Sequence, residues 1–161
     1  MSLTQYFAFE SFGIRIICIN LIIEFSIYYN LTGCSPDAGK ITGPTDIVFM
    51  MDMSASLLNT GFQKEKDFII SVINKVGPLS PPGLRAGVVL YNNEAKIEIA
   101  LNDYFERESF TDAIERLDYE PGTMTRIDLG LKESIKSFDE ENGARGASKK
   151  VCEASIRILS F

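Results

Sequence analysis

The sequence has 161 residues, enough for one domain with its own hydrophobic core and too few for two. Hydrophobic residues make up 45% of it and charged residues 24%, which is the composition of a globular chain and not of a disordered one. The formal net charge of −6 argues against nucleic acid as a partner, and the absence of histidine excludes His-dependent catalytic triads and zinc sites with histidine ligands.

Three cysteines, Cys18, Cys34 and Cys152, lie too far apart for a CxxC motif. Their odd number leaves at least one thiol unpaired within a monomer. Cysteine usage therefore does not identify the compartment.

The first segment contains an apolar stretch at residues 12–33, long enough to cross a bilayer. Arg15, Asn20 and Glu24 interrupt it, and a charge in the middle of a membrane span is costly. Three interpretations stay open: a degenerate export signal, a buried strand or helix, and a leader foreign to the domain. Any membrane contact is expected only through this stretch, used as an anchor.

A linker follows at residues 35–44, where Gly, Pro, Ser and Asp gather. We therefore expect residues 1–43 to form an apolar leader and linker, and residues 44–161 to form the domain.

Beyond the linker, short apolar runs alternate with segments of helical periodicity. The apolar runs predict buried strands, the strictly alternating run predicts the outer strand of a hairpin, and the periodic segments predict helices. The expected order is strand 46–51, helix 62–76, strand 84–91, strand 95–101, helix 110–117, helix 127–138 and a strand from about residue 149.

This order predicts an α/β fold, a Rossmann-like, doubly wound, mainly parallel sheet with one antiparallel edge strand. Ser109 and Asp112 have the spacing of a capping box for the 110–117 helix, and Gly143 is expected as a helix C-cap. Acidic side chains at Glu65 and Asp67, at Asp112 and Glu115, and in the 139–141 run are expected to be solvated.

The strongest chemical signal is Asp52-Met53-Ser54-Ala55-Ser56, directly after the first buried strand. Ligands of such sheets bind at the carboxyl ends of the strands. Residues two apart in an extended loop point the same way, so one carboxylate and two hydroxyls can converge. Such a set suits Mg²⁺ or Mn²⁺, which prefer oxygen ligands in octahedral geometry. The plainer alternative is that the serines only cap the next helix.

The segments TDIVFMMDMSAS, FQKEKDFIISVI, LRAGVVLYNNEAKIEIAL and TMTRIDLGL together resemble a von Willebrand factor type A domain, also known as the inserted domain of integrin α chains. The resemblance covers about residues 44–151. It implies a metal-ion-dependent adhesion site, with Asp52, Ser54 and Ser56 matching the family's D-x-S-x-S motif.

The family's next ligand is a threonine, for which Thr123 and Thr125 are candidates. In the family a small and an aliphatic residue follow that ligand by five and six positions. Gly130 and Leu131 stand at those offsets from Thr125, so we choose Thr125. A helix N-cap is the alternative role for either hydroxyl.

The family's last ligand is an aspartate after the following strand, and Arg157 stands at that position here. The chain departs from the family pattern at about residue 152, so it resembles a partial domain that lacks the C-terminal part of the fold.

The resemblance implies a binding module, not an enzyme, in an extracellular or cell-surface protein. A partner protein would complete the cation's shell with an acidic residue; collagen or another matrix protein is the family's usual partner class. Two other functions stay open: a structural fragment with an inactive metal site, and a metal-dependent hydrolase using Asp52. The hydrolase is disfavoured because no general base has a defined partner.

Overall fold

The structure is a computed structural model that describes residues 8–11, 14–19, 43–146 and 148–155. Within these ranges no helix combines the length and the apolar character that a membrane span requires. The boundary predicted between residues 43 and 44 stays a prediction.

One six-stranded sheet forms the centre of the fold, in the order β1-β2-β6-β3-β4-β5. β3 pairs in parallel with β4 and β6, and β6 pairs in parallel with β2. The bounds are β1 Ala8–Ser11, β2 Ile14–Ile19, β3 Thr45–Asp52, β4 Leu84–Tyr91, β5 Ala95–Ile99 and β6 Lys149–Ser155.

This sheet confirms the predicted α/β, mainly parallel architecture. β5 is the predicted antiparallel edge strand, and β1 is antiparallel at the opposite edge. β1 and β2 come from the region that the sequence left open, and β2 lies inside the apolar stretch at residues 12–33.

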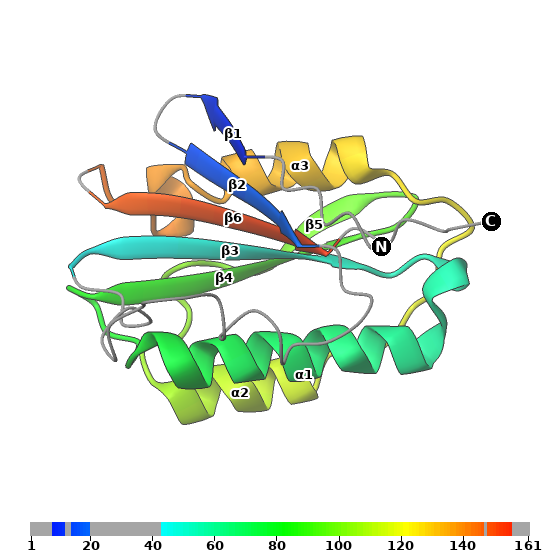
Figure 1. The fold of residues 1–161 in the computed structure, drawn as a ribbon, viewed down its shortest axis with the longest axis horizontal. Coiled ribbons are helices and arrows are strands. Elements are labelled where there is room, and N and C mark those ends of the chain that lie inside the picture. Colours follow the sequence, from blue (N-terminus) through cyan, green and yellow to red (C-terminus); the bar gives the residue numbers. More distant parts are fainter. Residues whose placement is uncertain (1–7, 12–13, 20–42, 147, 156–161) are drawn as a thin grey trace, which may run out of the picture.

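Helices cover both faces of the sheet (Figure 1). α1 (Leu58–Val76) and α2 (Arg107–Glu115) lie on one face, and α3 (Ile127–Lys136) lies on the other. Two short 3₁₀ helices, η1 (Ala55–Leu57) and η2 (Glu140–Asn142), precede α1 and follow α3.

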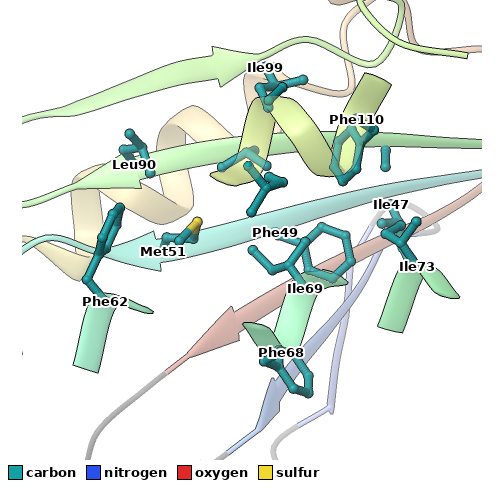
Figure 2. Packing of buried hydrophobic residues seen from close by; sticks show 14 of the residues in the cluster. Ile47, Phe49, Met51, Phe62, Phe68, Ile69, Ile73, Leu90, Ile99 and Phe110 are labelled. Carbon is teal, nitrogen blue, oxygen red and sulfur yellow. The ribbon is translucent and has the colours of Figure 1, made fainter. Parts of the chain in front are cut away.

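β3 is buried along its whole length because both of its faces are covered. Its side chains alternate: Ile47, Phe49 and Met51 enter the core beneath α1 and α2, whereas Val48 and Met50 enter the core beneath α3. In Figure 2, Phe62 and Ile69 of α1 lie over the first of these rows. The apolar run at residues 46–51, which predicted a strand buried on both faces, thus forms such a strand.

Two helix starts differ from the sequence-based prediction. α1 begins at Leu58, ahead of residue 62. α2 begins at Arg107 with Glu106 as its N-cap and no side-chain cap hydrogen bond, so the predicted capping box of Ser109 and Asp112 is wrong. Ser109 therefore lies inside the first turn of α2, next to the fully buried Phe110, and not at the position of an N-cap.

The cap predicted at Gly143 is present: its φ of 84° is left-handed, and it ends η2.

Candidate metal centre

Asp52 is the last residue of β3, at the carboxyl end of a strand that lies between β4 and β6. It is buried, with 6% of its surface exposed. Its Oδ1 accepts a hydrogen bond of 2.6 Å from the backbone N–H of Ser54. This bond turns the chain immediately after the strand and fixes the carboxylate at the sheet edge.

Ser54 and Ser56 lie together, with 3.1 Å between their Oγ atoms. Adjacent ligands of an octahedral Mg²⁺ ion, each about 2.0–2.1 Å from the metal, are about 2.9 Å apart. The two hydroxyls therefore have the spacing of two neighbouring corners of such a shell. The two serine hydroxyls of the motif are thus brought together, and their role as metal ligands stays a prediction.

The loop that carries the serines is held by the segment before α3. The Ala55 N–H donates to the Gly122 carbonyl at 2.8 Å, and the Gly122 N–H donates to the Met53 carbonyl at 3.0 Å. The Tyr119 hydroxyl adds a bond of 2.9 Å to the Ser54 carbonyl. Segments far apart in the sequence thus meet at one end of the sheet.

The two threonine candidates differ in their hydrogen bonding. Thr123 Oγ1 accepts a bond of 3.0 Å from Asn93 Nδ2. Thr125 is exposed, and its hydroxyl has no hydrogen bond to another described residue. The Arg126 N–H donates to the Asn92 carbonyl at 2.9 Å, which holds Thr125 beside the end of β4, the strand whose Tyr91 pairs with Asp52.

The small residue on which the choice of Thr125 depended lies in a close contact. A Cβ on Gly130 would be 2.7 Å from Met50 Sδ and 3.0 Å from Tyr91 Cγ, so α3 meets the sheet here. This packing and the free hydroxyl agree with Thr125 as the ligand, which stays a prediction. Arg157, expected at the last ligand position, lies outside the described residues.

Glu65 is a correction to the sequence-based prediction. It was expected on a solvated helix face, but it is buried, and its Oε2 accepts the Asp52 N–H at 3.0 Å. Burial raises the pKa of Glu65 to about 9, and the nearby Asp52 charge adds to the increase while the bond from the Asp52 N–H opposes it. The sequence does contain a signal for this burial: Glu65 stands three residues after Phe62 and four before Ile69, so it lies on the apolar stripe of α1.

With its pKa raised to about 9, Glu65 adds no charge to the cluster at pH 7. No group of three His, Cys, Asp or Glu side chains suited to a metal exists among the described residues. A cation here would therefore rest on one carboxylate and several hydroxyls. The acidic run at residues 139–141 is exposed, as predicted.

The fold and site define a class: an α/β domain with an oxygen-rich loop at the carboxyl end of its central strand. The sequence profile of the von Willebrand factor type A domain matches residues 46–152, and the chain belongs to that family. The resemblance stated from the motifs is confirmed.

The relatives are large proteins. The collagen alpha-2(VI) chain of Gallus gallus is 39% identical over 122 residues, which are 68% of this chain and 12% of that protein. Matrilin-2 of Mus musculus is 31% identical over 116 residues, 71% of this chain and 12% of that protein. The chain thus spans about an eighth of these two relatives. They are extracellular matrix proteins, which confirms the predicted extracellular or cell-surface location.

Solved structures share the fold. Proximal thread matrix protein 1 of the mussel byssus superposes with a TM-score of 0.67 at 22% identity, covering 76% of this chain and 33% of that one. A second structure of that protein, with a TM-score of 0.64 at 22% identity, covers 76% of this chain and 34% of that one, and has zinc in its own adhesion-site motif.

Proposed function

We propose that this protein is a metal-ion-dependent adhesion module. Asp52, Ser54, Ser56 and Thr125 would hold Mg²⁺ or Mn²⁺, and an acidic residue of a partner protein would complete the octahedron. The observation that carries the proposal is the 3.1 Å pair of serine hydroxyls beside the buried Asp52 carboxylate. The family and its matrix relatives support an adhesion role.

In this site Asp52 supplies the negative charge, and the hydroxyls supply neutral oxygen. One carboxylate leaves a divalent cation with a net positive charge, which would attract a second carboxylate from outside. In the metal-free chain burial raises the pKa of Glu65 to about 9, so Glu65 brings no second charge to the site at neutral pH before a cation binds. Matrix proteins, collagen among them, are the proposed partner class.

A hydrolase is the weaker alternative. A cavity of about 340 Å³ lies beside the loop and is lined by Met53, Lys96 and Glu120, among others. Lys96 forms an ion pair of 2.7 Å with Glu98, and the cavity contains no nucleophile hydrogen-bonded to a base. This cavity therefore gives the hydrolase no support.

Calorimetric titration of the full chain with Mg²⁺ and Mn²⁺ tests the proposal. Asp52→Asn keeps an oxygen that can accept the Ser54 N–H but removes the charge, so cation binding should fall at least tenfold. Asp67→Asn, on the exposed side of α1, is the matched control and should bind like the unmodified chain. No cation binding by the unmodified chain would favour the structural fragment with an inactive site.

A further inference from the structure

Three large apolar side chains are exposed among the described residues: Leu58 at 63%, Met124 at 49% and Ile135 at 51%. Two of them flank the proposed ligands. Leu58 follows Ser56 by two positions, and Met124 directly precedes Thr125. Ile135 belongs to the last turn of α3.

The loops that carry Leu58 and Met124 are held to one another. Ser54 forms a parallel bridge with Gly122, two residues before Met124. The Met124 N–H donates to Asn93 Oδ1 at 3.0 Å, which fixes the backbone while the side chain stays exposed. The two segments that carry these residues therefore meet at the end of the sheet where β3 leads into η1 and where the loop before α3 passes (Figure 1).

The backbone of Leu58 is strained. Its φ of 59° and ψ of 161° form a combination that glycine adopts readily and other residues rarely do. Leu57 beside it is buried in the core, so the turn itself has an apolar anchor without Leu58. A leucine that is both strained and exposed contributes little to folding, and such positions are found at functional sites.

We propose that Leu58 and Met124 form an apolar rim around the metal site that receives an apolar side chain adjacent to the partner's acidic residue. The proposal rests on the proposed function. The cation would attract any exposed carboxylate, so charge alone selects poorly among partners. The two rim side chains would favour a carboxylate with an apolar neighbour, because the contact removes apolar surface from water.

Small carboxylates separate the two parts of this recognition. Acetate, butyrate and hexanoate carry the same charge on tails of increasing length, and NMR titration of the Mg²⁺-loaded full chain measures their affinities. We expect hexanoate to bind about threefold to tenfold more tightly than acetate, since each buried methylene favours binding. Failure of all three to bind would contradict the proposed function itself. Equal affinities for all three would overturn the rim alone.

Variants of Leu58 and Met124 test whether these two side chains cause the preference for hexanoate over acetate. Leu58→Ser and Met124→Ser should each reduce the preference for hexanoate and leave acetate affinity unchanged. Ile135→Ser removes a side chain of similar exposure from α3 and should change neither affinity. A preference retained in both rim variants, or lost equally in Ile135→Ser, would overturn the assignment.

A readout without metal or ligand tests the strain. Leu58→Gly fits the left-handed backbone, so in chelator its transition temperature should exceed that of the unmodified chain while its hexanoate preference falls. A lower transition temperature would show that Leu58 serves folding and would overturn its place in the rim. Mg²⁺-dependent dimers that Leu58→Ser abolishes would identify a second copy as the occupant, and would also overturn it.

Discussion

The two ends of β3 carry one buried aspartate each, and their surroundings differ. Asp46 at the amino end is bound by Arg145 through its guanidinium, at 2.5 Å and 3.0 Å, and through its backbone N–H, and by the hydroxyl of Ser148. Asp52 at the carboxyl end accepts the Ser54 N–H and has no cationic side chain within ion-pair distance among the described residues.

Arg145 also binds backbone carbonyl groups at the amino end of the sheet. Its guanidinium donates to the carbonyls of Thr45, Gly83 and Pro81 at 2.8–3.1 Å. The charge of Asp46 is thus neutralised from within, whereas Asp52 has no such counter-ion among the described residues. The same residue type on one strand stabilises the fold at one end and, in the proposed function, holds a cation at the other.

Arg145→Met should give the largest effect on stability. It leaves the Asp46 carboxylate buried without a counter-ion, and breaking a buried pair in this way costs about 3–5 kcal/mol. Urea unfolding measures the loss in the free energy of unfolding. Arg126→Met breaks the exposed pair with Asp128 and is the matched control; its unfolding midpoint should match that of the unmodified chain. Equal losses in the two variants would contradict the role of burial.

Mg²⁺ should stabilise the folded chain through the other end of β3. At a free concentration one hundred times the dissociation constant, the free energy of unfolding should rise by about 2.7 kcal/mol. The rise should be absent in Asp52→Asn and retained in Asp46→Asn, if that variant folds. An equal rise in Asp52→Asn would place the cation elsewhere.

Glu65 should make the stability of the metal-free chain depend on pH. A carboxyl group with a raised pKa contributes stability below its ordinary pKa of 4.5 and loses it as the pH rises toward its folded value of about 9. The free energy of unfolding should therefore fall by on the order of 1 kcal/mol per pH unit between pH 5 and 8. Glu65→Gln keeps an acceptor for the Asp52 N–H and should remove most of this slope.

The control for that measurement is Glu141→Gln, in the exposed acidic run, which should leave the slope unchanged. Denaturant midpoints at several pH values in chelator supply the data. A slope that persists in Glu65→Gln would assign the pH dependence to another group.

Much of the fold follows from local patterns. The run at residues 46–51 indicated a doubly buried strand, and the spacing of Phe68, Ile69 and Ile73 indicated the core face of α1. The D-x-S-x-S motif indicated oxygen atoms at a strand end. These predictions succeed because side-chain direction has a period of two in strands and 3.6 in helices, so adjacent residues determine which face is buried.

Contacts between segments that are distant in the sequence could not be predicted from the periodicities of strands and helices. The sequence did not show that Asn93 donates a hydrogen bond to Thr123, 30 residues away, or that the Thr125 hydroxyl has no hydrogen-bond partner in the described part of the chain. Nor did it show that β2 would pair with β6, because a pairing edge has no local signature.

By itself, then, the sequence determined the alternation of strands and helices, the family, and the position of the oxygen-rich loop. Only the tertiary structure decided that Glu65 is buried against Asp52, that Arg145 neutralises Asp46, and that Leu58 is exposed in a strained turn beside the site. The physical reason is that burial and charge pairing depend on which segments pack together, and packing joins residues whose separation along the chain carries no periodic signal.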